Sequence, residues 1–282
     1  MAVDKKSIPF DNFGGEGPLL HFAHANGYPP ACYRRLVAPL TDHYQVLAVH
    51  HRPLWPGTMP EELDSWHQIG QDMLRFFEEH KLSNIIGVGH SLGAVETMFA
   101  AIQRPDLFRA VVLIEPVFLM PAILHLFDVQ PKGTLTEVFP LVNITKSRRN
   151  SWDSREEAFD HFRPKRVFAK WSDDVLWDYI WHGLHKNEAG KIELTYAPEW
   201  EARIYSLPPT DVWELIPKIN RPTLGIRGSD TDTLVPAAWH LWQMAQPKGK
   251  FLDIKDCTHM LPMEKPLEIA EAIHNFLKAL HI

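Results

Sequence analysis

Apolar residues occur in short, nearly continuous runs that alternate with longer segments of helical periodicity. The runs are rich in β-branched and aromatic residues, and their lengths are those of strands. They are Pro18–Ala23, Gln45–His50, Asn84–Gly89, Arg109–Glu115, Pro222–Arg227 and Phe251–Lys255. Because strands of a parallel sheet are buried on both faces, they are apolar throughout rather than at every second position. The pattern therefore predicts a buried, mostly parallel sheet.

Three intervals between these runs predict helices. Pro60–His80 carries one apolar stripe, and Lys265–Leu280 carries another near the end of the chain. Pro60 suits the first turn of a helix, so we expect that helix to begin there. Leu92–Gln103 is apolar on nearly every side, which is typical of a buried helix. Strands alternating with helices predict a doubly wound α/β fold.

The interval 118–215 breaks this alternation. It contains no convincing buried strand, and its short helical patterns are interrupted by prolines. Six of the ten tryptophans of the chain lie in it. We interpret 118–215 as a mostly helical lid, or cap, inserted into an α/β core formed by residues 1–117 and 216–282.

A Gly-x-Ser-x-Gly pattern follows the third predicted strand and precedes the apolar helix. It reads Gly89-His90-Ser91-Leu92-Gly93. In this context the pattern predicts a nucleophile elbow, in which Ser91 occupies a sharp strand-to-helix turn. Side chains at the two glycine positions would collide with neighbouring backbone. The N–H of Leu92, the residue after the nucleophile, is the expected donor to an oxyanion.

A serine needs a base, and His259 has the position that this fold requires. It follows the last predicted strand, and loops after strand C-termini face the ligand crevice of a parallel sheet. The acid that orients its imidazole is expected after the preceding strand, where Asp230 and Asp232 both lie. One of them orients His259, and the other has an ordinary capping role in the loop.

With these motifs the chain resembles the α/β-hydrolase superfamily, in particular its lid-bearing esterase, lipase and haloperoxidase-like members. The elbow, the aspartate loop and the segment Thr258–Pro266 carry the resemblance, which extends over almost the whole chain. In such proteins the acid commonly lies four residues before the proline of a Val-Pro pair. That proline is Pro236 here, and this implies Asp232 rather than Asp230.

The resemblance also implies an oxyanion donor after the first central strand, although the motif departs from the family pattern. The family usually has His-Gly there, and this chain has His24-Ala25-Asn26-Gly27-Tyr28. The donor is the N–H of Asn26 if His24 takes the place of the family histidine. It is that of Tyr28 if Gly27 takes the place of the family glycine. We favour Asn26.

These residues predict a serine hydrolase that cleaves a small, rather hydrophobic carboxylic ester through an acyl-enzyme, without metal or cofactor. We expect the substrate to be bound by His24, Tyr28, His90, Trp152, Trp177 and Trp181, although His90 also has a structural interpretation. Alternatives are C–C bond hydrolysis, thioester hydrolysis, a lyase or perhydrolase reaction on the same triad, or a non-catalytic ligand receptor.

Composition and charge add expectations about binding partners and location. The net charge of −6 makes nucleic acid a poor partner, because a protein that binds a duplex usually has a basic surface. No apolar stretch is long enough to span a membrane, and the N-terminus has no signal-peptide pattern. We therefore expect a cytoplasmic protein that acts on a small molecule. The oligomeric state is left open.

Overall fold

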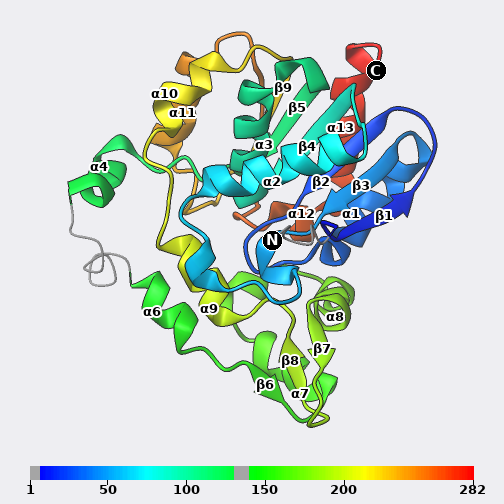
Figure 1. The fold of residues 1–282 in the computed structure, drawn as a ribbon, viewed down its shortest axis with the longest axis vertical. Helices are drawn as coiled ribbons and strands as arrows, with labels where there is room; N and C mark the ends of the chain where they lie inside the picture. Colours follow the sequence, from blue (N-terminus) through cyan, green and yellow to red (C-terminus); the bar gives the residue numbers. More distant parts are fainter. Residues whose placement is uncertain (1–6, 130–139) are drawn as a thin grey trace, which may run out of the picture.

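The computed structural model describes residues 7–129 and 140–282, and its centre is a seven-stranded sheet (Figure 1). The strand order is β1-β3-β2-β4-β5-β9-β10; β1 is antiparallel to β3, and the other pairs are parallel. The strands are β1 (Phe10–Gly14), β2 (Leu19–Ala23), β3 (Gln45–Val49), β4 (Ile85–His90), β5 (Phe108–Ile114), β9 (Thr223–Gly228) and β10 (Lys250–Ile254). This confirms the predicted α/β fold with a mostly parallel sheet.

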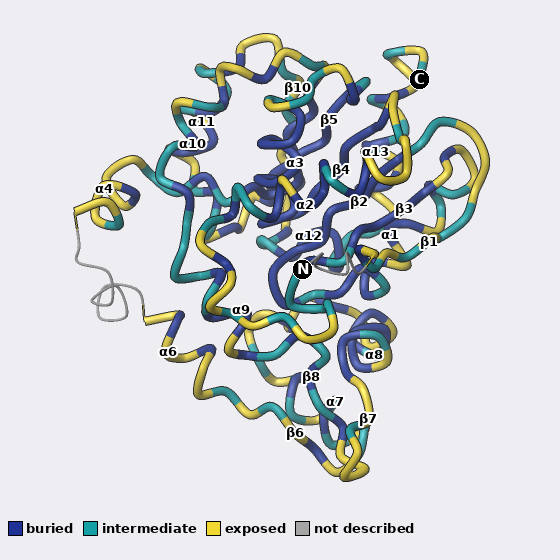
Figure 2. The backbone as a smooth tube through the Cα atoms, in the orientation of Figure 1, coloured by how far each residue is buried: buried dark blue, intermediate teal, exposed yellow. Residues whose placement is uncertain are grey.

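Helices cover both faces of the sheet, and successive strand residues alternate between two apolar cores. Ile86 and Val88 of β4 face the core shared with α1 (Arg34–Val37) and α13 (Pro266–Ala279). Ile85 faces the opposite core, shared with α2 (Trp66–Glu79), α3 (Leu92–Gln103) and α11 (Pro236–Ala245). Every residue of β4 is buried, as the dark central strands in Figure 2 show.

The helix predicted from Pro60 begins later, at Trp66. Pro60–Glu62 instead forms a single 3-10 turn, and the backbone is extended at Leu63 and at Ser65. The extended segment leaves the Leu63 carbonyl free to accept two hydrogen bonds from the guanidinium of Arg203, at 2.9 and 2.7 Å. A continuous helix would have used that carbonyl internally.

The chain between β5 and β9 forms a separate group of elements, most of which lie below the sheet in Figure 1. Its described helices are α4 (Pro121–Val129), α6 (Leu141–Lys146), α7 (Arg155–Phe162), α8 (Asp173–His182), α9 (Pro198–Tyr205) and α10 (Val212–Leu215). It also contains a small antiparallel sheet, which the sequence pattern did not predict. That sheet is made of β6 (Ser151–Trp152), β8 (Ile192–Leu194) and β7 (Leu184–Lys186), in that order. These strands are too short to show a periodic pattern.

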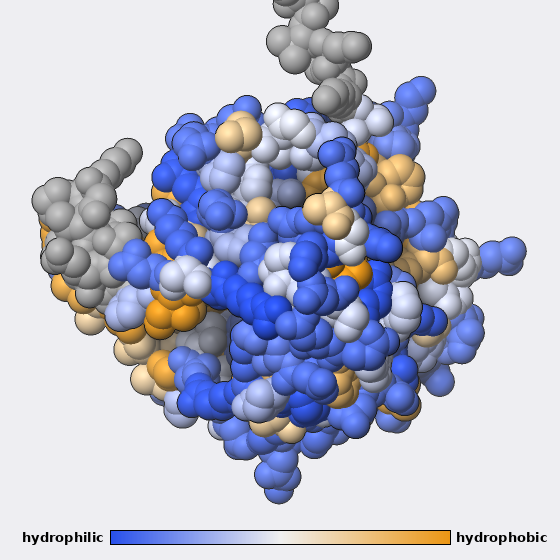
Figure 3. Space-filling view, turned by 90° about the horizontal axis from the view of Figure 1, so that it is seen from below, coloured by the Kyte–Doolittle hydropathy of each residue, from blue (hydrophilic) through white to orange (hydrophobic). Residues whose placement is uncertain are grey.

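The two ends of this insertion lie together, since the Trp213 indole donates to the Leu119 carbonyl at 2.8 Å. Residues 130–139, inside the interval interpreted as the lid, are outside the described part of the chain. Exposed apolar side chains flank them on α4 and α6, and apolar surface gathers on that side of the molecule (Figure 3).

Candidate active site

Ser91 lies on a sharp turn between β4 and α3. Its backbone has φ 57° and ψ −117°, a conformation that residues other than glycine rarely adopt. The Ser91 N–H donates to the Ile114 carbonyl at 3.0 Å, which fixes the turn to the end of β5. The structure thus has the strand-turn-helix geometry expected of a nucleophile elbow.

The two glycines of the motif are required by close backbone contacts. A Cβ at position 89 would lie 2.2 Å from the Gly93 carbonyl oxygen. A Cβ at position 93 would lie 2.2 Å from the Ala23 carbonyl oxygen at the end of β2. Any side chain at either position would therefore push α3 away from the sheet.

His259 meets Ser91 across the carboxyl edge of the sheet. Its Nε2 is 2.9 Å from the Ser91 hydroxyl oxygen. The loop that carries it joins β10 to the short helix α12 (Leu261–Glu264). The Glu264 carboxylate holds this loop by accepting hydrogen bonds from the Thr258 N–H at 2.8 Å and the Thr258 hydroxyl at 2.5 Å. Glu264, which lies in the segment Thr258–Pro266, therefore fixes the histidine loop.

The carboxylate that contacts His259 belongs to Glu115, directly after β5. Its Oε2 is 3.1 Å from His259 Nδ1, and its side chain is fully buried. The same carboxylate accepts hydrogen bonds from the Gly228 N–H and the Thr231 hydroxyl, each at 2.7 Å. Glu115 has a positive φ of 47°, which turns it out of the direction of the strand.

The expectation that Asp232 orients His259 therefore needs correction. Asp232 is exposed and pairs with Arg166, and Asp230 pairs with the Lys170 amine at 2.6 Å. Both cations belong to the insertion. The physical reason is the direction of the loop after β9, because Thr231, between the two aspartates, is the residue that points inward to Glu115.

One signal for Glu115 was present in the sequence. It ends the otherwise apolar run Arg109–Glu115, and β5 is the neighbour of β4, which carries the nucleophile. A carboxylate at the carboxyl end of a buried parallel strand faces the crevice in which ligands bind. The apolar pattern by itself indicates only that Glu115 is the last residue of a strand.

The two expected oxyanion donors occupy suitable positions. Leu92 is the first residue of α3, where a backbone N–H has no acceptor within the helix. Within the described chain the N–H of Asn26 also has no protein acceptor, whereas the N–H of Tyr28 donates to the Ala25 carbonyl at 3.3 Å. Because β2 and β4 are adjacent, their C-terminal loops lie side by side. The geometry supports Asn26 over Tyr28.

The two histidines expected to bind substrate bond to protein atoms instead. His24 is fully buried; its Nδ1 is 2.9 Å from the Ala25 carbonyl, and its Nε2 accepts from the His51 N–H at 3.2 Å. His90 is also fully buried, and its two nitrogens contact the Tyr33 hydroxyl and the His259 carbonyl. Neither imidazole has a nitrogen left for a ligand.

The aromatic residues expected in the pocket mostly pack within the insertion. Trp152 is buried against Phe162, and Trp177 stacks on Phe159 with ring centroids 4.6 Å apart. Trp181 is 58% exposed. Tyr28 is the exception, because it follows the oxyanion loop and packs against the insertion.

The sequence did not predict a partly buried ion pair beside the loop that carries Asn26. The Arg148 guanidinium contacts the Glu201 carboxylate at 2.5 Å, and a Cβ at Gly27 would lie 2.7 Å from that carboxylate. Asn26 is tied to the same helix, since its side-chain amide donates to the Glu201 carbonyl at 3.0 Å. Burial raises the pKa of Glu201. The insertion therefore reaches the loop that carries the expected oxyanion donor.

Two kinds of feature are absent from the described residues. No group of three or more His, Cys, Asp or Glu side chains there is placed to hold a metal ion. None of the described helices combines the length and the apolar character needed to cross a membrane.

Comparison with known proteins places this geometry in a family. Abhydrolase domain-containing protein AFT2-1 of Alternaria alternata is 23% identical over 230 residues, which is 69% of this chain and 83% of that protein. The crystal structure of E-2-(acetamidomethylene)succinate hydrolase is similar with a TM-score of 0.79 at 20% identity, covering 95% of this chain and 94% of that one. A marine microorganism esterase is similar with a TM-score of 0.70 at 16% identity, covering 96% and 99%.

The sequence profile of one family matches most of the chain, from residue 22 to residue 272, and its description is "Alpha/beta hydrolase family". The profile spans the elbow, the residue after β5 and the histidine loop. Sheet order, elbow geometry and sequence profile agree, so this chain belongs to the alpha/beta hydrolase family.

Proposed function

We propose that this chain is a serine hydrolase with a triad of Ser91, His259 and Glu115. The observation that carries the proposal is the pair of contacts made by His259. One imidazole nitrogen is 2.9 Å from the serine hydroxyl, and the other is 3.1 Å from a buried carboxylate. The carboxylate accepts a hydrogen bond from Nδ1–H, which leaves Nε2 free to take the proton of the serine.

The reaction follows from this arrangement. The Ser91 oxygen attacks a substrate carbonyl while His259 takes the hydroxyl proton, and the carbonyl oxygen becomes an oxyanion that the N–H groups of Leu92 and Asn26 bind. His259 then protonates the leaving group as the tetrahedral intermediate collapses to an acyl-enzyme. A water molecule, deprotonated by the same imidazole, cleaves the acyl-enzyme and regenerates Ser91.

A small, rather hydrophobic carboxylic ester is the substrate class we propose. Ser91 is only 7% exposed, so its substrate must enter an enclosed site. Neighbouring apolar side chains at Leu92 and Met260 are buried. Tyr28 packs against Tyr179 and Trp171 of the insertion, with ring centroids 5.4 and 6.1 Å apart. We propose that 118–215 acts as the lid that closes this site.

Labelling and turnover test the proposal together. A fluorophosphonate probe is expected to label the folded wild-type protein once, at Ser91, and p-nitrophenyl esters of short acids are expected to turn over. Ser91→Ala should abolish both, whereas the matched change Ser147→Ala, at an exposed position, should alter neither. A wild-type protein without label or ester turnover would contradict the proposal. Turnover of only diketones or acyl-CoA thioesters would keep the triad and replace the substrate class.

A further inference from the structure

A chain of buried hydrogen bonds joins three loops of the active site. The Ala25 N–H donates to the Tyr33 hydroxyl oxygen at 3.2 Å. That hydroxyl is 2.8 Å from His90 Nδ1, and His90 Nε2 is 2.9 Å from the His259 carbonyl oxygen. Ala25, Tyr33 and His90 are all at least 97% buried. Water therefore has little access to these bonds.

The position of every proton in this chain of hydrogen bonds follows from the groups at its two ends. The His259 carbonyl can only accept, so His90 Nε2 must carry a proton. A neutral imidazole has a single N–H, and Nδ1 of His90 is consequently an acceptor. Tyr33 then donates its proton to Nδ1, and its oxygen is left to accept from the Ala25 N–H. One arrangement satisfies every donor and every acceptor.

The neutral form of His90 has an independent cause. Burial lowers its pKa well below the ordinary value, and proximity to His259 lowers it further. A charged His90 would present a second N–H to the Tyr33 oxygen. The hydroxyl proton would then have no acceptor in a buried place, which is unfavourable.

The chain of hydrogen bonds adjoins groups that the proposed reaction uses. Ala25 precedes Asn26, an expected oxyanion donor, and His90 precedes Ser91. The last acceptor is the backbone of His259 itself. These loops follow β2, β4 and β10, and three strand steps separate β4 from β10 in the sheet. Direct strand pairing therefore does not set the distance between the elbow and the histidine loop.

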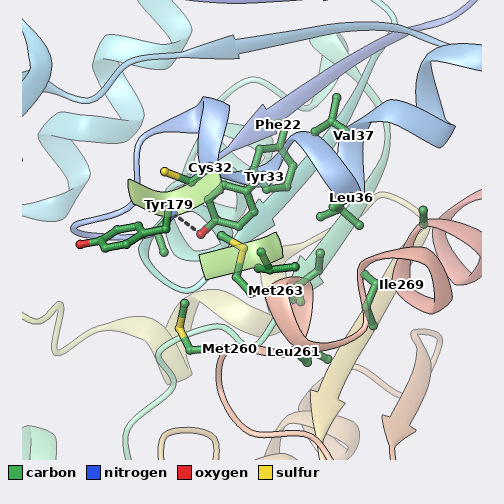
Figure 4. Close-up of a cluster of buried hydrophobic side chains, with 14 of the residues drawn as sticks. Phe22, Cys32, Tyr33, Leu36, Val37, Tyr179, Met260, Leu261, Met263 and Ile269 are labelled. Atoms are coloured by element: carbon green, nitrogen blue, oxygen red, sulfur yellow. Dashed lines mark hydrogen bonds between the residues drawn. The ribbon is translucent and has the colours of Figure 1, made fainter. Parts of the chain in front are cut away.

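We propose that Tyr33 and His90 are positioning residues, which fix the oxyanion loop and the histidine loop relative to the nucleophile. This inference rests on the proposed function. The Tyr33 ring is held among Cys32, Leu36 and Met263, and one of its hydrogen bonds is dashed in Figure 4. Because the packed ring has no room to rotate, it holds the groups that are hydrogen-bonded to it at fixed positions.

The protein provides a matched control at Tyr44, which lies outside this chain of hydrogen bonds. Its side chain is also only 1% exposed, and its hydroxyl is also hydrogen-bonded to an imidazole, 3.2 Å from His274 Nδ1. Tyr44 precedes β3, at the end of the sheet opposite to the catalytic loops. Tyr44→Phe therefore removes the same atom from another tyrosine that is hydrogen-bonded to an imidazole, without touching the active site.

The first measurement compares Tyr33→Phe with Tyr44→Phe for ester turnover, fluorophosphonate labelling and thermal unfolding. We expect Tyr33→Phe to lower kcat about 10- to 100-fold with KM within about threefold, less than the loss of a whole oxyanion donor. Tyr44→Phe should keep kcat, with a similar shift in unfolding temperature. Equal kcat in the two variants would overturn the inference, whereas a wild-type protein that does not label would overturn the proposed function.

The second measurement does not depend on activity. Imidazole nitrogen NMR of protein labelled with ¹⁵N-histidine reports the tautomer of each ring, and the signals missing from His90→Gln identify His90. We expect the Nε2–H tautomer at pH 7, with the Nδ1 resonance shifted in Tyr33→Phe and unchanged in Tyr44→Phe. An Nδ1–H tautomer, or a charged ring, would overturn the inference.

Discussion

Glu115 leaves β5 with a positive φ, and this one backbone angle decides where its carboxylate lies. The side chain turns toward the crevice, where it accepts from Gly228, Thr231 and His259. Gly228 is required here, because a Cβ at that position would lie 2.5 Å from the Cys257 carbonyl oxygen. At the scale of single residues, the orientation of His259 thus depends on a strand end rather than on the loop after β9.

Glu115→Gln is expected to lower kcat by about 10⁴-fold, while Asp232→Asn should leave it within about threefold. The amide of glutamine keeps the shape of the carboxylate but not its charge, so the imidazolium formed during the reaction is no longer stabilised. Asp232 only forms an exposed ion pair with Arg166, and such pairs contribute about 0–1 kcal/mol. Steady-state kinetics on a p-nitrophenyl ester gives both values.

Asp230→Asn is the control for that comparison, since it removes the second aspartate of the same loop. A large loss of kcat in Asp232→Asn, with normal activity in Glu115→Gln, would reverse the assignment of the acid. Unfolding curves of all three variants show whether the loss is chemical or structural.

At the scale of elements, the elbow depends on the close approach of α3 to β2. Gly93→Ala would place a Cβ 2.2 Å from the Ala23 carbonyl oxygen, so the start of α3 must move away from β2. We expect it to lower the free energy of unfolding by about 1–3 kcal/mol, as overpacking does. The N–H of Leu92 also moves relative to Asn26, so kcat should fall as well.

Gly190→Ala separates this steric effect from backbone strain. Gly190 lies in an exposed turn with φ +80°, and the nearest atom to its Cβ would be 3.7 Å away. Its substitution costs only the strain of a left-handed residue, about 1–2 kcal/mol, and should not change kcat. Equal kcat in Gly93→Ala and wild type would contradict this account of the elbow.

The elements that the sequence predicted are those whose environment is uniform. All six apolar runs form strands, and Leu92–Gln103 is a buried helix with the predicted bounds. β1 was not predicted because it is an edge strand whose residues are exposed or only partly buried. The predicted start of α2 was wrong because the observed start depends on a tertiary contact between Arg203 and the Leu63 carbonyl. The carboxylate that contacts His259 was missed for a similar reason, since only the three-dimensional contacts distinguish Glu115 from the aspartates after β9.

At the scale of the whole molecule, the insertion is bound to the core at several separate places. Asp178 of α8 pairs with Arg35 of α1, and the Trp66 indole of α2 donates to the Ile204 carbonyl at 2.9 Å. Lys170 reaches Asp230 beside the histidine loop. Opening of the proposed lid must break such contacts, and closing restores the enclosure around Ser91.

The core beneath the site contains several buried neutral imidazoles, and this gives the whole fold a dependence on pH. Burial lowers the pKa of His21 to about 3, and it lowers the pKa of His24 well below the ordinary value, as it does for His90. Burial also lowers the pKa of His51, but its hydrogen-bond partner Glu96 has a pKa that burial raises, so the two effects on stability oppose each other.

The sign follows from linkage. An unfolded histidine binds a proton below about pH 6.5, whereas these three stay neutral in the folded protein until far lower pH. The unfolded state thus binds more protons between those values, and stability falls as the pH decreases through 6.5. Glu201 acts in the opposite direction, because its raised pKa favours the folded state at low pH. Three imidazoles outweigh one carboxyl.

We therefore expect the free energy of unfolding to fall by about 1.4 kcal/mol per histidine for each pH unit below 6.5. Urea unfolding followed by tryptophan fluorescence at pH 7.5, 6.5 and 5.5 measures this loss above the range in which ordinary carboxylates titrate. His21→Gln should reduce the slope between pH 6.5 and 5.5 by the contribution of one histidine, because a glutamine cannot be protonated there. His281→Gln, at an exposed position, should leave the slope unchanged. An unfolding free energy that stays constant from pH 7.5 to 5.5 would show that the buried imidazoles accept protons without loss of the fold.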